Sequence, residues 1–196
     1  MLVVRPIFAQ TVLCSLSFAL MMSSRGARDL RAVLCKDGTH ATLEHTAVYM
    51  GKDCGRWTCH RELTSYPGSA ATPQKIHLKD FDLCTANCET YCDSPVIDGP
   101  PDVEDCRALA SYYKDAGRFT IDAHKYIIWE YDTCRVTQYN RLNHDDQRIS
   151  YCFDQDHWAG VVDGISSHCG SKANAHGGSC YFYDSLYFSS ITVEKA

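Results

Sequence analysis

Apolar residues in the carboxy-terminal half of the chain repeat with helical spacing in two segments. In the first segment, 103–116, four residues share one face of a helix: Val103, Cys106, Ala110 and Tyr113. Asp102 precedes them and can accept backbone N–H bonds as an N-cap, while Gly117 can end the helix in a left-handed conformation. The pattern predicts a helix whose cysteine points into the core.

The second helical segment, 154–170, has a stronger apolar stripe. Its members are Trp158, Val161, Val162, Ile165 and Cys169. Asp154 or Asp156 is expected to cap its start, and Gly170 is expected to end it. Gly160 and Gly164 weaken a helix. We therefore expect that another element packs closely against the helix at these two positions.

Between these two helices, residues 118–140 and 148–154 are rich in β-branched and aromatic side chains, which is typical of strands. The simplest arrangement is a hairpin that turns within 141–147. Cys134 and Cys152 are equally distant from residue 143, so the pattern leaves a bond between them open. An aromatic run after Cys180 predicts one or two closing strands.

The order helix, strands, helix, strand predicts an α+β fold, a disulfide-stabilised α/β sandwich in which two helices pack on one face of an antiparallel sheet. Proline and glycine cluster at 65–74 and again at 93–102, which indicates turns. We place a boundary at the second cluster. It divides a cysteine-rich amino-terminal region, 30–92, from an α+β domain, 103–196.

Residues 1–24 have the pattern of a secretory signal peptide, with an early cation at Arg5, an apolar stretch at 7–22 and no acidic residue. A membrane anchor is the alternative, but the stretch is shorter than the ~20 residues that a bilayer requires, and it is interrupted by polar residues. No later segment has the composition of a membrane span. We therefore expect a secreted, extracellular protein.

Twelve cysteines in 196 residues are many, and an extracellular location favours disulfides over metal thiolates. Removal of 1–24 leaves eleven candidate half-cystines: Cys35, Cys54, Cys59, Cys84, Cys88, Cys92, Cys106, Cys134, Cys152, Cys169 and Cys180. Because eleven is odd, one cysteine stays free or joins a second molecule, which leaves a disulfide-linked dimer open.

Three of these cysteines, Cys84, Cys88 and Cys92, are spaced so that a helix would align them. They could bind a metal together with His60 and His77, or they could pin a short helix to strands around Cys35, Cys54 and Cys59. The extracellular location favours the second interpretation. We interpret the segment CGRWTCH, 54–60, as a disulfide loop, and we expect neither a metal site nor a cofactor.

The composition and motifs give little support for catalysis. A net charge of −5 disfavours nucleic-acid binding, and the chain contains no GxSxG, GxxxxGK[ST] or HExxH motif. The best candidate for a ribonuclease site is the group His124, Glu130 and Arg135. On one regular strand, however, Arg135 would point away from the other two. We therefore predict no catalytic residue and a protein that is not an enzyme.

Several short motifs of the carboxy-terminal segment occur in the same order as in a known family. They are EDCRAL, GRFTID, YDTCRVTQYN, ISYCFDQDHWAGVVDGISSHCG and AHGGSC. This succession resembles the necrosis-inducing factor domain of fungal secreted effectors. The matching positions are Asp105, Cys106, Gly117, Phe119, Thr120, Cys134, Asp156, Ile165, Gly178 and Cys180. Two further cysteines, Cys152 and Cys169, depart from the family pattern and could form an added bond.

The resemblance implies a secreted fungal virulence protein that induces plant cell death. We expect such a protein to act by binding a cell-surface or extracellular protein of a host or a competitor. The family is also similar to killer toxins, so an antimicrobial that acts on a membrane protein or channel of a competitor is an alternative. A secreted ribonuclease is a third hypothesis. The resemblance implies no catalytic residue.

Overall fold

The computed structural model describes residues 32–60, 79–93, 99–142, 145–169, 177–182 and 189–196. The predicted signal peptide, 1–24, lies outside these residues. Contacts between Cα atoms place Arg31–Ala196 in one unit.

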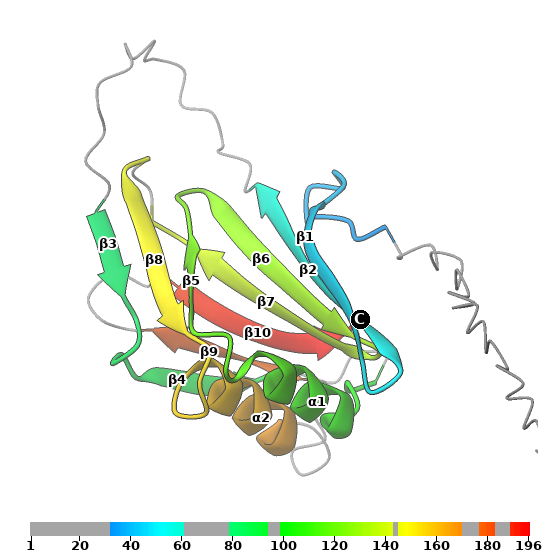
Figure 1. Ribbon diagram of the computed structural model, residues 1–196. Coiled ribbons are helices and arrows are strands. Elements are labelled where there is room, and N and C mark those ends of the chain that lie inside the picture. Colours follow the sequence, from blue (N-terminus) through cyan, green and yellow to red (C-terminus); the bar gives the residue numbers. More distant parts are fainter. Residues whose placement is uncertain (1–31, 61–78, 94–98, 143–144, 170–176, 183–188) are drawn as a thin grey trace, which may run out of the picture. The chain divides into compact units, whose positions relative to one another are not determined.

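The largest element is a seven-stranded sheet in which each strand is antiparallel to its neighbours (Figure 1). The strands lie in the order β1-β2-β6-β7-β10-β9-β4. Their bounds are Thr42–Tyr49 for β1, Lys52–His60 for β2, Cys88–Cys92 for β4, Lys125–Tyr131 for β6, Cys134–Asn140 for β7, Gly178–Phe182 for β9 and Ser189–Lys195 for β10.

A second, smaller sheet has the order β3-β8-β5. It consists of β3, Lys79–Asp82, β5, Arg118–Ile121, and β8, Gln147–Cys152. Strand β8 is parallel to β3 and antiparallel to β5. The sequence patterns did not predict this separate sheet.

Two helices form where the apolar periodicity predicts them, α1 over Val103–Tyr113 and α2 over Trp158–His168. Asp102 caps α1 as expected, because its Oδ1 accepts a 2.9 Å hydrogen bond from the backbone N–H of Glu104. The start of α2 differs from the prediction, since His157 occupies the N-cap position and its side chain does not cap the helix. Asp154 instead accepts a 3.0 Å bond from the backbone N–H of Asp156.

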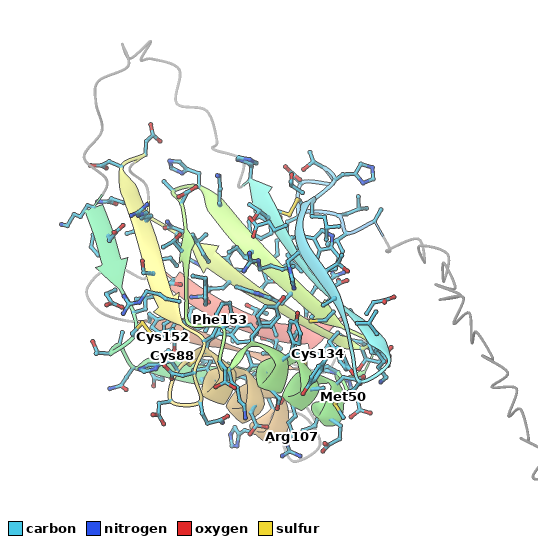
Figure 2. The ribbon with its side chains drawn as sticks, in the orientation of Figure 1. Met50, Cys88, Arg107, Cys134, Cys152 and Phe153 are labelled. Atoms are coloured by element: carbon cyan, nitrogen blue, oxygen red, sulfur yellow. A yellow bond between two sulfur atoms is a disulfide. The ribbon has the colours of Figure 1, made fainter. Side chains whose placement is uncertain are left out.

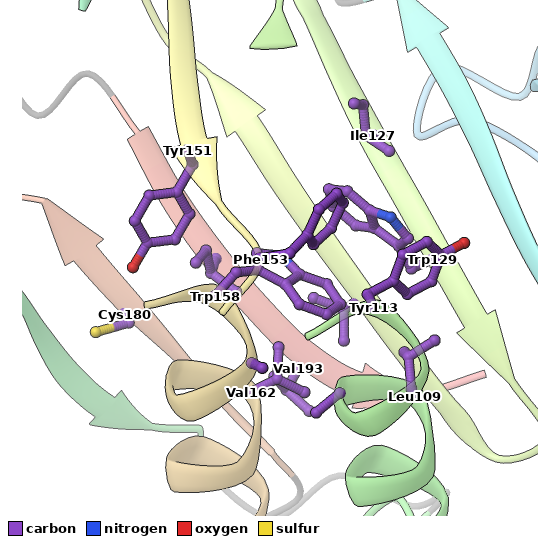
Figure 3. Packing of buried hydrophobic residues seen from close by; sticks show 14 of the residues in the cluster. Leu109, Tyr113, Ile127, Trp129, Tyr151, Phe153, Trp158, Val162, Cys180 and Val193 are labelled. Atoms are coloured by element: carbon purple, nitrogen blue, oxygen red, sulfur yellow. The ribbon is translucent and has the colours of Figure 1, made fainter. Parts of the chain in front are cut away.

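Both helices pack on the same face of the seven-stranded sheet, which confirms the predicted fold class. Helix α1 contacts β6 and β7, whereas α2 contacts β4, β9 and β10. A large aromatic cluster fills the space between the layers (Figure 3). The Trp158 ring centroid lies 4.9 Å from that of Trp129 and 5.3 Å from that of Phe153. Residues of the small sheet, such as Phe119, complete this cluster.

The amino-terminal and carboxy-terminal regions contribute strands to the same sheet. Strand β2 pairs with β6 through Cys54–His60, and β4 pairs with β9 through Cys88–Cys92. The segment 93–102 therefore does not separate two compact units. The two regions depend on each other because the strands of one satisfy the backbone hydrogen bonds of the other.

The predicted hairpin that would turn within 141–147 is wrong, because residues 118–140 contain three strands instead of one. The tight turn lies between β6 and β7 at Asp132 and Thr133, where Asp132 has a φ of 50°. Cys134 consequently belongs to the large sheet, while Cys152 ends a strand of the small one. The two cysteines do not face each other.

Candidate functional site

Ten of the eleven candidate half-cystines form disulfides. The bonds are Cys35–Cys59, Cys84–Cys152, Cys88–Cys180, Cys92–Cys169 and Cys106–Cys134. Three of them connect the 30–92 region to the 103–196 region. Cys88–Cys180 joins β4 to β9 within the large sheet, Cys92–Cys169 joins β4 to the end of α2, and Cys84–Cys152 reaches β8 of the small sheet. Disulfides in this number are typical of secreted extracellular proteins.

The expected helix through Cys84, Cys88 and Cys92 is wrong, since Cys88–Cys92 is strand β4. These cysteines are half-cystines, but their partners lie in the carboxy-terminal region. The Cys152–Cys169 bond that the sequence left open does not form, because each of these two cysteines pairs with the amino-terminal region.

The expected disulfide loop at 54–60 is wrong for a geometrical reason. The segment is strand β2, and cysteines five residues apart on a strand point to opposite faces. Cys59 pairs with Cys35, whereas Cys54 is a free thiol that is 0% exposed. Burial raises the pKa of Cys54 to about 11. A disulfide-linked dimer through Cys54 is therefore excluded while this fold is intact.

One group of potential metal ligands exists among the described residues, Cys152, Asp154 and His157, whose ligand atoms lie within 4.8 Å of one another. Cys152 is bonded to Cys84, so it offers no thiolate. The other hypothesis, a cluster of Cys84, Cys88, Cys92, His60 and His77, is contradicted by the disulfides that use all three cysteines; His77 itself lies outside the described residues.

The candidate ribonuclease group is not brought together as a unit. Glu130 and Arg135 are direct partners across the β6–β7 turn, with an ion pair of 2.5 Å, so the expectation that they point to opposite faces is wrong. His124 precedes β6 and lies six residues before Glu130 in the sequence. Six residues of extended strand span about 20 Å, so His124 lies far from Glu130. Its Nε2 lies 2.8 Å from an oxygen of Asp145 instead.

The β1–β2 hairpin ends in a tip, residues 48–52, with an unusual exposure of apolar side chains. Val48 is 69% exposed and Met50 is 76% exposed. Met50 and Gly51 form the two-residue turn, with φ values of 48° and 82°. Positive φ at both central residues gives a turn whose twist matches that of the strands, so the tip is a regular hairpin end.

A pocket of about 520 Å³ lies beside this tip, between the hairpin, α1 and β6. Met50, labelled beside α1 in Figure 2, and Arg107 of that helix line the same pocket. Six of the lining residues matter here: Tyr49, Met50, Lys52, Asp105, Arg107 and Tyr131.

Two of the residues that line this pocket, Lys52 and Asp105, belong to an ion-pair network. The Lys52 ammonium lies 2.7 Å from Asp105 and 2.5 Å from Asp132. Asp105 also accepts hydrogen bonds from the hydroxyl of Thr133, at 2.7 Å, and from its backbone N–H, at 3.3 Å. Burial raises the pKa of Asp105, but the bonds from Lys52 and Thr133 outweigh it and hold the pKa below its ordinary value. The bonds that Lys52 donates to Asp105 and Asp132 raise the pKa of Lys52.

Aromatic contacts hold the hairpin against α1. The Tyr49 ring centroid lies 5.2 Å from that of Tyr112 and 6.3 Å from that of Tyr131. The Tyr131 hydroxyl donates a 3.1 Å bond to the backbone carbonyl of Tyr49. His45 adds a 2.9 Å contact to the Tyr112 hydroxyl. The exposed tip therefore belongs to a hairpin whose aromatic residues pack firmly against α1 and β6.

Sequence reasoning missed this surface, although a local signal was present. Two runs typical of strands, TLEHTAVY and KDCGRWTCH, are separated by the dipeptide Met-Gly. A two-residue connection that contains Gly between such runs indicates a hairpin. Because cysteines are frequent in this region, we interpreted it as disulfide loops instead of a hairpin.

Fold and site together define a disulfide-stabilised α+β protein with an exposed apolar hairpin tip. The chain matches no protein-family model, no curated protein and no solved structure. Within the described residues, none of the helices has the length and apolar character to cross a membrane.

Proposed function

We propose that this protein is a secreted, non-enzymatic effector that binds a protein on the surface of a target cell through the hairpin tip and the pocket beside it. The single observation that carries the proposal is the exposure of Val48 and Met50 next to a pocket of about 520 Å³. Methionine is flexible and polarizable, so it adapts to varied partner surfaces and is common in binding sites. Methionine is also enriched in protein–protein interfaces, so an exposed methionine beside a pocket suits a protein partner.

The rigid base supports the same interpretation. Lys52 and Asp105 hold the hairpin to α1, and the Cys106–Cys134 disulfide joins α1 to the first residue of β7. A contact surface held in one conformation loses less entropy on binding than a flexible one. The resemblance to fungal necrosis-inducing effectors adds the expectation that binding leads to plant cell death.

The proposal is tested by infiltrating purified, oxidised protein into leaves. The informative variant is the double substitution Val48→Lys and Met50→Lys, which places charges on the tip without touching the core. Leu34→Lys is the matched control, since Leu34 is 52% exposed but lies outside the tip. We expect cell death with the wild type and with Leu34→Lys, and loss of it with the double variant.

Thermal unfolding of all three proteins establishes that each one folds. Full activity of a folded double variant would contradict the proposal, as would a wild type that causes no cell death. Parallel treatment of competing fungi tests the killer-toxin alternative, since arrested growth in the absence of leaf cell death would favour that activity over the proposed one.

A further inference from the structure

The seven-stranded sheet ends at β1, a strand with a free outer edge (Figure 1). Among the described strands, β1 pairs only with β2. An edge strand presents backbone N–H and C=O groups that can pair with a further strand. Strand β1 has eight residues, whereas β4 at the other end of the sheet has five, and the edge strands β3 and β5 of the small sheet have four each. The longest open edge of the described residues is therefore β1.

This strand lacks the features with which proteins commonly block an edge, such as lysine, proline and unpaired charges. Its sequence, TLEHTAVY, contains neither lysine nor proline. Glu44 is its one acidic residue and forms a 3.0 Å ion pair with Arg56 of β2. A bulge between Leu43 and His45 interrupts the start of the strand, so that residues 45–49 form its regular part. This regular part is able to extend the sheet.

The turn of the hairpin determines which backbone groups of β1 point outward. Tyr49 and Lys52 flank the two-residue turn, so they form a hydrogen-bonded pair. Hydrogen-bonded and non-hydrogen-bonded pairs alternate along an antiparallel ladder. The N–H and C=O groups of Thr46 and Val48 therefore point away from β2, whereas those of Ala47 point toward it.

Exposed apolar side chains also gather along this part of the chain. Of the five large apolar side chains that are exposed in the described residues, four lie within 34–50. Two of the four belong to β1, since Leu43 is 44% exposed and Val48 is 69% exposed. A strand added at this edge would remove apolar surface from water as well as satisfy backbone groups, and both effects favour association.

We propose that β1 pairs antiparallel with β1 of a second copy of this chain, which joins two seven-stranded sheets into one. A two-fold axis at Ala47 makes the edge complementary to itself. Thr46 of each copy then lies opposite Val48 of the other copy, and these are the residues whose backbone groups point outward. Each such pair exchanges two backbone hydrogen bonds. The dimer is non-covalent and leaves the buried Cys54 thiol untouched.

The side chains that meet in this register favour a second copy as the occupant. His45 lies opposite Tyr49 of the other copy, and Ala47 lies opposite Ala47, so no two carboxylates face each other although the chain has a net charge of −5. The paired segment of five residues is as long as the ladder between β4 and β9 in the same sheet. A second copy also brings an edge of the same length with its outward groups at the same spacing.

Sedimentation velocity of purified, oxidised protein over a range of concentrations tests the proposal. We expect the wild type to form a dimer, and Thr46→Lys to weaken dimerisation by about tenfold or more, because lysine blocks an edge. Thr90→Lys is the matched control, since Thr90 is likewise an exposed threonine on an edge strand, β4, at the other end of the sheet. It should dimerise like the wild type. Thr46 lies outside the hairpin tip, and no target is present, so this test can fail or succeed independently of the proposed function.

Amide hydrogen exchange of the wild type, followed by NMR at low and high protein concentration, locates the interface even if Thr46→Lys does not fold. The amides of Thr46 and Val48 should exchange about tenfold more slowly in the dimer, because they become hydrogen-bonded only there. The amide of Ala47 bonds to β2 in both states and is the internal reference. A wild type that stays monomeric up to about 1 mM would overturn the proposal. So would a dimer in which Thr46 and Val48 exchange as fast as in the monomer, or a folded Thr46→Lys variant that dimerises like the wild type.

Discussion

Lys52 and Asp105 form a 2.7 Å ion pair that joins the β1–β2 hairpin to the first turn of α1. Asp105 also binds the hydroxyl and the backbone N–H of Thr133 in the β6–β7 turn. One carboxylate therefore connects three segments that are distant in the sequence. The neighbouring Cys106–Cys134 disulfide links two of them covalently, so the Asp-Cys pair at 105–106 acts as a structural junction.

Replacement of Asp105 by Ala is expected to lower the free energy of unfolding by about 2 kcal/mol at neutral pH. The substitution leaves the Thr133 donors and the Lys52 ammonium without their main acceptor. Hydrogen bonds to charged groups each contribute roughly 1.5–3 kcal/mol to stability. The bond from Lys52 contributes less than this because Lys52 is exposed and water screens its charge. Glu104→Ala is the control, because the Glu104 side chain is 77% exposed and an exposed ion pair contributes less than about 1 kcal/mol. Urea titration of both variants measures the difference, and equal stabilities would contradict the assigned role.

Because its pKa is lowered in the fold, Asp105 also makes stability depend on pH. Its contribution is fully present above the ordinary carboxyl pKa of about 3.9 and is lost as pH falls through the lower value in the folded protein. The stability difference between wild type and Asp105→Ala should therefore be constant from pH 7 to pH 5 and should shrink below about pH 4. Urea midpoints measured across this range test the sign, and a difference that grows in acid would refute it.

The two glycines of α2 are expected to respond oppositely to alanine. A Cβ on Gly160 would lie 2.1 Å from the backbone oxygen of Gln155, so Gly160→Ala should destabilise the protein by more than about 1 kcal/mol. A Cβ on Gly164 meets nothing within 4 Å, and Gly164→Ala should add about 0.5–1 kcal/mol through helix propensity. Thermal melts of the two variants give the comparison. A stabilising Gly160→Ala would show that the turn before α2 is free to move.

The Cys54 thiol should be unreactive in the native protein. It is fully buried, and its raised pKa of about 11 leaves almost no thiolate at neutral pH. We expect iodoacetamide to modify Cys54 only after denaturant is added, with the five disulfides left intact. Peptide mapping under non-reducing conditions identifies the site. Rapid labelling of the folded protein at Cys54 would mean that β2 opens readily.

The interpretation of the cysteines shows where sequence reasoning succeeded and where it failed. The composition and the apparent leader segment were sufficient to expect half-cystines, yet every specific pairing that we considered differs from the structure. Pairing depends on which face of a strand each sulfur occupies and on which strands are neighbours, and neither property is local. Cys54 illustrates this, since it lies in the same strand as Cys59 but faces the opposite side of the sheet.

The sequence by itself determined the two helices and the α+β class, because apolar spacing, the Asp102 cap and runs of β-branched residues act over a few neighbouring positions. Only the tertiary structure decided the order of the strands, the five disulfide partners and the position of the hairpin tip beside its pocket. Those features join residues as far apart as Cys88 and Cys180, which are separated by 92 positions. Such pairs form when the chain buries its aromatic cluster between the sheet and the helices, and that packing is a property of the whole chain.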